Sequence, residues 1–321
     1  MQRSVPAYKV VRRKLADGTI KEYRYERKAG PQTQAGPDSL GALIVAYRAS
    51  PQFTGLRAST QKTYGYYLRH LEAYAEVPAR AMKRRDLLDA RDAIAAASGN
   101  GAANVFMRVS TTVFNWARDR EWVEHSPVDR VRSLAGGHLA AWTVAEADHA
   151  ATALGEPLRR AVILARYTGQ RRGDLIAMTW ADIADGSIRV KQEKTGAELT
   201  IPLHPALRAE LAIWRQARTS THILTSGRGR PWKANHLTHE MQAALPEAGL
   251  RAGLNIHGLR KLAAAELASA GCSTHEIAAV TGHRSLAMVQ LYTASAQQGR
   301  LAKAAILRLE NAAGKRRKTP T

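Results

Sequence analysis

Residues 257–292 read HGLRKLAAAELASAGCSTHEIAAVTGHRSLAMVQLY and include His257, His283, Arg260 and Tyr292 among helix-like segments. His257 and Arg260 are three residues apart, so a helix places them on one face. Tyr292 follows His283 by nine positions. A tyrosine hydroxyl has a pKa of about 10 and is a weak nucleophile unless a group such as histidine takes its proton. Arginine presents a planar fork that matches two phosphate oxygens, so this set of side chains suits attack on a phosphodiester.

Helix start and stop signals divide this stretch into three helices. Apolar residues recur at helical spacing in its first part, and Gly271 is a C-terminal stop. Ser273 and Glu276 form the pattern of a capping box that opens a second helix, which Gly282 closes. Ser285 is placed to cap a third helix.

A pair of strand-like segments lies upstream of this stretch. Ile188 and Val190 alternate with polar residues, and the alternation resumes at Leu199 after a turn at 194–196. Lys194 lies on that turn. A lysine at the tip of a hairpin is flexible and charged, which suits donation of a proton to a departing oxygen.

Five motifs in chain order resemble the tyrosine recombinase (phage integrase) family. They are Thr168-Gly169-Gln170-Arg171, Asp174-Leu175, His257-x-x-Arg260, Gly282-His283 and Tyr292. The family places its catalytic lysine on the hairpin turn, so the resemblance assigns that role to Lys194, with Lys191 in the first strand as the competitor. The implied catalytic set is Arg171, Lys194, His257, Arg260, His283 and Tyr292, and Asp174 stands where the family has a supporting acidic residue.

The resemblance also implies a mechanism, in which Tyr292 attacks a DNA phosphate to give a 3′-phosphotyrosyl enzyme and a free 5′-hydroxyl. The implied roles are phosphate binding by Arg171, Arg260 and His283, acceptance of the tyrosine proton by His257, and protonation of the leaving 5′-oxygen by Lys194. Two positions depart from the family pattern. Lys261 follows the His-x-x-Arg motif where smaller residues or histidine are frequent, and Thr281 precedes the Gly-His pair where leucine is usual.

The chain of 321 residues is strongly basic, with a formal net charge of +21 and a pI near 10.5. This charge indicates a polyanionic partner, most simply nucleic acid, although ribosomal proteins and solubilising basic surfaces share the composition. A hydrophobic content of 45% and a mean hydropathy of −0.33 fit a soluble protein with room for two domains. The single Cys272, with no membrane span or signal-peptide core, predicts an intracellular location. The resemblance implies the cytoplasm of a prokaryotic cell, near the nucleoid.

No cofactor or metal is expected. The sequence has no Walker motif and no dinucleotide-binding fingerprint. His236 and His239 are three residues apart, but no further ligand converges at a metal-binding spacing, so a surface position is favoured. The chemistry is therefore expected to need neither ATP nor metal.

Residues 1–35 are basic and predict a β-hairpin. Tyr8–Lys14 and Thr19–Arg27 flank Asp17-Gly18, a typical hairpin turn. Many phage integrases carry a small N-terminal DNA-binding arm, which this segment resembles; a solvated extension with no role is the alternative.

Residues 36–134 resemble the helical core-DNA-binding domain of the family. The expected helices run from Ser39 to Ala49, onward from Ser59, over about 86–97 up to a stop at Ser98-Gly99, and over about 100–120. The candidate DNA contacts are Thr60, Lys62, Arg69, Lys83, Arg84 and Arg85 here, with Arg172 and Lys233 further along the chain. Each of them alone is more typical of a solvated surface residue.

A Gly-containing linker, residues 135–141, leads to a catalytic domain over residues 142–321. Thr143 with Glu146 forms a capping-box pattern near its start. Residues 302–309 hold apolar residues in helical register before a basic tail at 315–318. In this family such a C-terminal segment often docks on the neighbouring protomer; packing on its own domain is the alternative.

The predicted fold is mainly α-helical with a small β-hairpin and sheet, in which a helical core-binding domain and an α+β catalytic domain close like a C-shaped clamp around DNA. The resemblance implies a site-specific integrase of a phage or mobile element. It also implies double-stranded DNA as partner, a homotetramer on two duplexes and accessory DNA-bending proteins. Two alternatives share the residue set or the fold: a type IB topoisomerase-like nicking and closing enzyme, and a non-catalytic DNA-binding regulator. The DNA target does not follow from the sequence, because base readout depends on which side chains enter the grooves.

Overall fold

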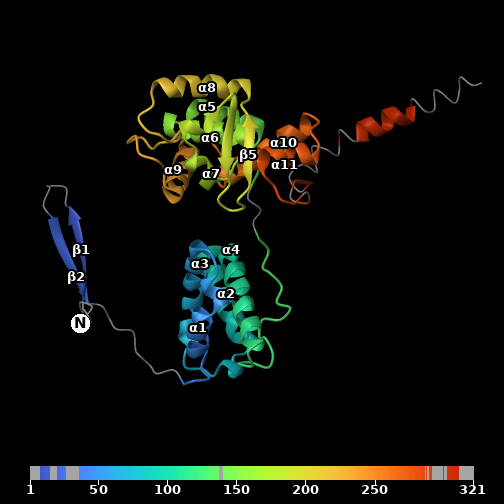
Figure 1. The fold of residues 1–321 in the computed structure, drawn as a ribbon. Coiled ribbons are helices and arrows are strands. Elements are labelled where there is room, and N and C mark those ends of the chain that lie inside the picture. Colours follow the sequence, from blue (N-terminus) through green and yellow to red (C-terminus); the bar gives the residue numbers. More distant parts are fainter. Residues whose placement is uncertain are drawn as a thin grey trace, which may run out of the picture. The chain divides into compact units, whose positions relative to one another are not determined.

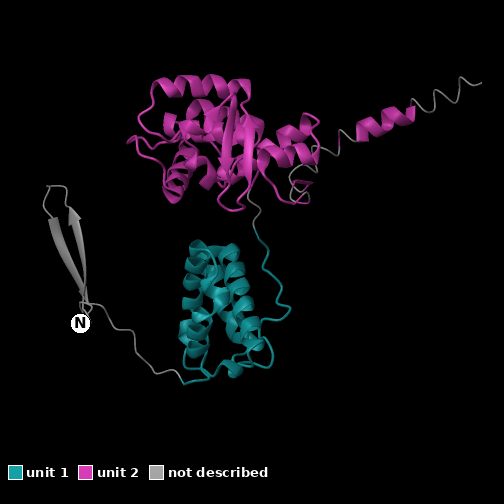
Figure 2. Ribbon diagram, viewed as in Figure 1, with its two compact units in different colours: residues 1–137 teal, residues 138–321 magenta. Residues whose placement is uncertain are grey.

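The computed structural model describes residues 36–136, 140–285, 287, 289–290, 299 and 302–310, and the backbone of residues 8–14 and 20–26. The chain forms two compact units, residues 1–137 and residues 138–321 (Figure 2). Helices dominate both units and the sheets are small, so the predicted mainly helical fold class is confirmed. In the described part of the chain, no helix combines the length and apolar character needed to cross a membrane.

The first unit is a helical bundle around one core. Its elements are α1 (Leu40–Ala49), α2 (Pro51–Thr54), α3 (Ala58–Leu68), η1 (Arg69–Tyr74), η2 (Ala79–Ala81) and α4 (Arg84–Arg118) (Figure 1). Leu43, Leu68 and Phe106 are fully buried where the apolar faces meet. Ser39 caps α1 as predicted, since its hydroxyl oxygen accepts a hydrogen bond from the Ala42 N–H at 3.2 Å.

One helix start in this unit differs from the prediction, and one predicted helix break is confirmed. Arg57, not Ser59, is the N-cap of α3, because its carbonyl oxygen accepts the first helical hydrogen bonds from the N–H groups of Thr60 and Gln61. The break predicted at Ser98-Gly99 is confirmed: within α4, Gly99 has non-helical torsions (φ 82°, ψ 164°) between two helical stretches. Glycine takes a positive φ at little cost, so the chain leaves the helix at Gly99 and resumes it at once.

The N-terminal strands are β1 (Tyr8–Lys14) and β2 (Ile20–Glu26). They pair antiparallel with Val11 opposite Tyr23, which confirms the predicted strand pair. The predicted turn at Asp17-Gly18 lies outside the described residues.

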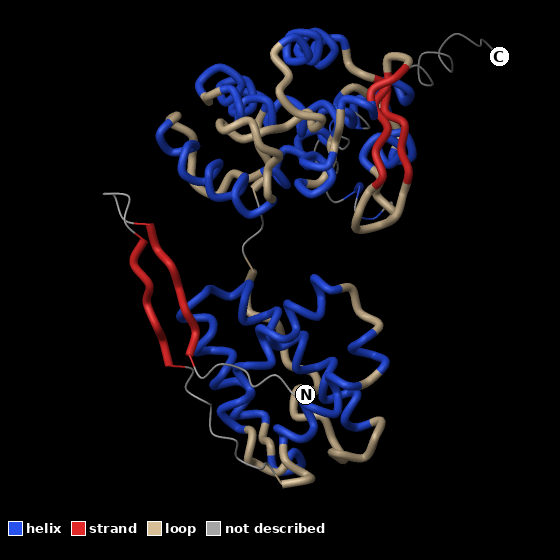
Figure 3. The backbone as a smooth tube through the Cα atoms, turned by 60° about the vertical axis from the view of Figure 1, so that its left-hand side comes forward, coloured by secondary structure: helices blue, strands red, loops and turns tan. Residues whose placement is uncertain are grey.

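The second unit combines helices with a three-stranded sheet. Its helices are α5 (Val144–Ala153), α6 (Glu156–Thr168), α7 (Arg172–Ala177), η3 (Trp180–Asp182), α8 (Pro205–Gln216), α9 (Ala234–Glu247), α10 (Ile256–Ser269) and α11 (Thr274–Thr281). Its strands β3 (Ile183–Ala184), β4 (Ser187–Lys191) and β5 (Glu198–Pro202) are antiparallel in the order β3-β4-β5 (red in Figure 3).

Helix α6 lies at the centre of this unit and packs against α5, α7 and α10, while β5 lies beside α11 (Figure 1). The capping boxes predicted at Thr143 and Ser273 are both present, each with the glutamate three residues on. These caps orient α5 and α11 at their first turns, and α11 in turn positions the Gly-His motif that follows it.

The chain after α11 is described only in part. Residues 287, 289 and 290 are helical, and Tyr292 lies outside the described residues. Residues 302–310 are helical, as predicted, with exposed side chains at Ile306, Leu307 and Leu309.

Candidate active site

Arg171 is held at the junction between α6 and α7. Helix α6 ends at Gly169 in the left-handed conformation (φ 63°, ψ 20°), and Arg171 is the N-cap of α7. A Cβ on Gly169 would lie 3.1 Å from the Thr281 methyl carbon, so glycine allows both the turn and the close approach of α11. The side chain of Arg171 is partly exposed beside the first backbone N–H groups of α7, where an anion would be favoured.

Gln192, immediately after β4, is fully buried and links three segments of the site. Its Oε1 accepts hydrogen bonds from Arg171 Nη1 at 2.6 Å and from Thr195 Oγ1 at 2.8 Å. Its Nε2 donates to Gln170 Oε1 at 2.7 Å and to the Thr281 carbonyl at 2.9 Å. All four hydrogen-bonding positions of the amide are used, so its orientation is fixed and Arg171 is held to the hairpin and to α11.

Asp174 anchors the hairpin turn that carries Lys194. It is buried, and its Oδ1 accepts a hydrogen bond from the Glu193 N–H at 2.9 Å. Its Oδ2 lies 3.8 Å from Arg171 Nη1. Asp174 therefore ties the start of α7 to the turn and adds a negative charge beside Arg171. Lys194 is exposed on the turn, while Lys191 lies in β4, ion-paired with Glu198 at 2.9 Å.

Arg260 is almost completely buried on α10. Its Nη1 donates to the Gly169 carbonyl at 2.9 Å and to the Thr281 carbonyl at 2.6 Å. The Thr281 carbonyl thus receives both Arg260 and Gln192. The two arginines are held in one hydrogen-bonded network that runs from Arg171 through Gln192 and Thr281 to Arg260.

The Gly282-His283 motif closes this network. Gly282 caps α11 in the left-handed conformation (φ 71°), and a Cβ there would lie 2.7 Å from Gln192 Cδ. The Nδ1 atom of His283 lies 2.6 Å from Thr281 Oγ1. Only glycine therefore allows the chain to turn against Gln192 and bring the imidazole back beside Thr281.

Both histidines of the site are half-buried among positive charges. Burial lowers the pKa of His257, and Lys261, Arg260, Arg171 and Lys194 lower it further. Burial lowers the pKa of His283 to about 4, with further contributions from Arg260, Arg171 and His257. Both imidazoles are therefore predominantly neutral at pH 7 before an anion enters the site.

An open cleft of about 500 Å³ borders these residues. Its lining includes Arg171 and Arg172 from the α7 junction, Lys194 from the turn, and His257 from α10. Thr238, Met241 and Gln242 of α9 also line the cleft, and Arg172 donates a hydrogen bond to Thr238 Oγ1. The cleft thus has cationic side chains at Arg171, Arg172 and Lys194, which matches a phosphate-bearing substrate.

The structure brings five of the six predicted catalytic residues into one site, and the sixth, Tyr292, lies outside the described residues. The sequence did not single out Gln170 or Gln192 as parts of the site. Gln170 Nε2 donates to the Val280 carbonyl at 2.9 Å, so both glutamines act through contacts between distant segments. In the sequence, Gln170 directly precedes Arg171 and Gln192 lies two residues before Lys194. That proximity to predicted catalytic residues is the signal that could have pointed to them.

The candidate DNA contacts are spread over both units. In the first unit Lys62, Arg69, Lys83, Arg84 and Arg85 are exposed and Thr60 is half-exposed. Arg69 lies over the Tyr66 ring at 5.0 Å, and Arg84 donates to the Asp129 carbonyl. In the second unit Lys233 is exposed at the N-cap of α9.

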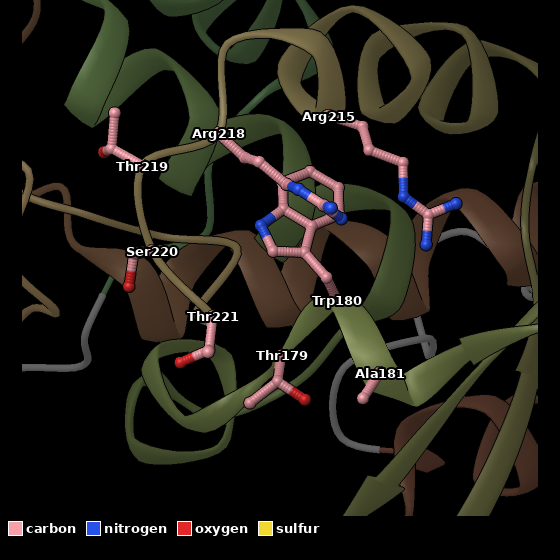
Figure 4. A pocket seen from close by; sticks show the side chains of 8 residues that line it. All are labelled: Thr179, Trp180, Ala181, Arg215, Arg218, Thr219, Ser220 and Thr221. Carbon is pink, nitrogen blue, oxygen red and sulfur yellow. The ribbon is translucent and has the colours of Figure 1, made fainter.

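A separate hollow near η3 contains none of the predicted residues. It is lined by Thr179, Trp180, Ala181, Arg215, Arg218, Thr219, Ser220 and Thr221 (Figure 4). Arg215 of α8 lies 5.9 Å from the centre of the Trp180 ring. The Nε2 atom of His236, which lies three residues before His239 in the sequence, is 3.1 Å from Oε1 of Glu240.

The close approach at Gly282 leads to a stability prediction. Gly282→Ala should lower the free energy of unfolding through left-handed strain and through overlap with Gln192. Gly271→Ala is the matched control, because Gly271 also follows a helix with positive φ (97°) but has no atom within 4 Å of an added Cβ. We expect Gly282→Ala to cost about 1–3 kcal/mol more than Gly271→Ala in urea unfolding. Equal losses of unfolding free energy in the two variants would show that the Gln192 side chain can move aside to accept a Cβ at position 282.

Comparisons with known proteins agree with this site. Residues 143–299 match the phage integrase family model. The integrase of Escherichia phage HK022 is 28% identical over 265 residues, which cover 78% of this chain and 73% of that protein. The integrase of Escherichia phage lambda is 34% identical over 100 residues, which cover 29% of this chain and 28% of that protein.

Solved structures share the fold. A lambda integrase dimer bound to a COC′ core site matches with a TM-score of 0.70 and 22% identity, over 79% of this chain and 95% of that one. The Tn1549 transposon integrase in complex with transposon right end DNA matches with a TM-score of 0.69 and 16% identity, over 82% of this chain and 99% of that one. The family match lies within the second unit, which also holds the clustered arginines and histidines. This chain therefore belongs to the phage integrase family of tyrosine recombinases, enzymes of site-specific DNA recombination.

Proposed function

We propose that this recombinase cleaves and rejoins DNA by attack of the Tyr292 hydroxyl on a backbone phosphate. The Tyr292 oxygen forms a bond to phosphorus, the bond from phosphorus to the 5′-oxygen breaks, and the product is a 3′-phosphotyrosyl enzyme with a free 5′-hydroxyl. The observation that carries this proposal is the network that holds Arg171, Arg260 and His283 around Thr281, next to the cleft lined by His257 and Lys194.

The proton transfers follow from the charge states of the site. His257 accepts the tyrosine proton, and its lowered pKa keeps it neutral and able to do so at pH 7. Arg171 and Arg260 bind the non-bridging oxygens, where charge develops in the transition state. Lys194 gives its proton to the departing 5′-oxygen. One phosphoester replaces another, so bond energy is kept and a 5′-hydroxyl from a second strand reverses the step.

Lys194→Ala should slow cleavage by about 10²- to 10⁴-fold, the usual contribution of a general acid. A substrate with sulfur in place of the bridging 5′-oxygen should restore most of the rate, because a thiolate leaves without protonation. Lys191→Ala is the control, since Lys191 forms an ion pair with Glu198 on the neighbouring strand β5. Single-turnover cleavage of both substrates by both variants decides the matter: a loss and sulfur rescue in Lys191→Ala instead would move the acid role to that residue.

The DNA partner and the assembly follow from charge and fold. A net charge of +21 favours binding to duplex DNA, and the two units would hold it as a clamp, with the basic N-terminal arm as a further contact. A lambda integrase tetramer bound to a Holliday junction shares the fold, with a TM-score of 0.70. This chain is proposed to assemble likewise on two duplexes in the cytoplasm of a prokaryotic cell. The apolar side chains exposed on helix 302–310 are available to dock on a neighbouring protomer.

The test is covalent trapping on a nicked suicide duplex that carries the attachment site, in the presence of EDTA. A denaturation-resistant adduct on the 3′ end would support the proposed cleavage and its independence of metal. Strand exchange between two duplexes would then separate recombination from a topoisomerase-like nicking and closing reaction. Tight, salt-sensitive binding with no adduct would instead favour a non-catalytic regulator.

A further inference from the structure

Thr281, the last residue of α11, is buried and has two short contacts through one hydroxyl group. Its Oγ1 donates a hydrogen bond to the Ile277 carbonyl at 2.6 Å, one helical turn earlier. The same Oγ1 lies 2.6 Å from Nδ1 of His283. A purely apolar side chain at this position would have no atom able to make either bond.

The protons of these two contacts can be assigned by elimination. The Ile277 carbonyl is only an acceptor, and the threonine hydroxyl has a single proton. When that proton lies on the bond to Ile277, His283 Nδ1 must donate its own proton to Oγ1. The opposite arrangement would leave two oxygen atoms 2.6 Å apart with no proton between them. Both contacts are therefore hydrogen bonds only when Nδ1 of His283 carries the proton.

We infer that Thr281 is a positioning residue that fixes neutral His283 as the Nδ1–H tautomer, so that His283 can donate a hydrogen bond to the scissile phosphate through Nε2 only after taking up one proton. This inference rests on the proposed function for its catalytic consequence, but the tautomer itself is a property of the free protein. In a neutral imidazole only one nitrogen carries a proton, so Nε2 is an acceptor while Nδ1 is bonded to Thr281.

The surroundings of the ring make proton uptake depend on the substrate. Arg260 and His257 face His283 from α10, and Arg171 faces it from the start of α7, while Lys194 of the hairpin acts on His257. These positive charges oppose protonation of the ring in the free protein. A phosphate held by the two arginines offsets them, so the imidazolium forms when DNA is bound. The proton comes from solvent and stays on Nε2, shared with a phosphate oxygen.

The tautomer can be read directly by NMR of protein labelled with ¹⁵N-histidine, because a protonated and an unprotonated ring nitrogen resonate far apart. The His283→Gln spectrum identifies the signals of His283. The native protein and Thr281→Ser should show Nδ1–H, and Thr281→Val should gain Nε2–H. Thr168→Val is the matched control and should keep Nδ1–H, since Thr168 is equally buried and makes the same kind of bond, at 2.6 Å to the Leu164 carbonyl, on a different helix, α6. An Nε2–H signal in the native protein, or the same tautomer in native and Thr281→Val protein, would overturn the inference.

The catalytic consequence appears in the pH profile of single-turnover cleavage. In the native enzyme and in Thr281→Ser the rate should fall by about tenfold per pH unit above the pKa of His283 in the DNA complex. In Thr281→Val the fall should be less than about twofold per unit, because neutral His283 can then donate through Nε2. A merely structural threonine would lower the rate at every pH and leave parallel profiles, which would count against the proton uptake. If no variant cleaves DNA, the proposed function fails and the NMR result still decides the tautomer.

Discussion

Tyr292→Phe is expected to remove the covalent adduct with DNA altogether, while the affinity for the attachment-site duplex stays within about twofold of the native value. Phenylalanine keeps the ring but lacks the oxygen that must bond to phosphorus, and no other group replaces a covalent nucleophile. Binding depends on many phosphate contacts along the duplex, so one hydroxyl contributes little to it. Denaturing gels of trapped complexes measure the adduct, and electrophoretic mobility shifts measure the affinity.

Tyr167→Phe is the matched control for this experiment. Tyr167 is the other tyrosine of the second unit, and its ring stacks on His204 at 4.7 Å between centroids. Phenylalanine preserves that stack, so Tyr167→Phe should form the adduct like the native protein. If the adduct still forms in Tyr292→Phe and is lost in Tyr167→Phe, the nucleophile is Tyr167 and the assignment of Tyr292 is wrong.

Arg260→Ala is expected to slow cleavage by about 10²- to 10³-fold, which corresponds to about 3–4 kcal/mol for one preorganised donor in the transition state. The substitution also removes two hydrogen bonds to the Gly169 and Thr281 carbonyls and so lowers the free energy of unfolding. Affinity for DNA should change little, since the loss falls on a charge that develops during the reaction. Single-turnover rates at saturating protein separate the two effects.

Arg166→Ala separates the loss of stability from the loss of catalysis. Like Arg260, Arg166 links α6 to α10, here through an ion pair with Glu266 at 2.7 Å, and it also bonds Asp148 at 2.6 Å. Its removal should destabilise the second unit but spare the cleavage rate of the folded fraction. A similar loss of rate in both variants would mean that Arg260 acts through stability rather than on the phosphate.

Local signals in the sequence predicted much of this fold. Capping boxes at Thr143 and Ser273, the stop at Gly271 and the strand alternation around 188–201 depend on neighbours within a few residues, and the structure contains each of them. The start of α3 was misplaced because Ser59 is a good capping residue by type, while the backbone conformation of Arg57 decides the actual cap.

The supporting network of the site was beyond the reach of sequence patterns. Gln192 is a polar residue after a strand, and nothing nearby in the chain shows that its amide meets Arg171 and Thr281 from two distant segments. Thr281 stood out only as a departure from the leucine of the family, and its bond to His283 depends on the turn that Gly282 makes. Such roles arise from tertiary packing, so they follow from the structure alone.

The assignment of Tyr292 as the nucleophile is tested most directly by identifying the residue that becomes linked to DNA. Trapped adduct from the suicide duplex would be digested with protease and nuclease, and the remaining nucleotide-bearing peptide sequenced by mass spectrometry. We expect a 3′-nucleotide joined through phosphate to Tyr292. A linkage to Tyr167, to a serine or to any other residue, or attachment through the 5′ end of the broken strand, would contradict it.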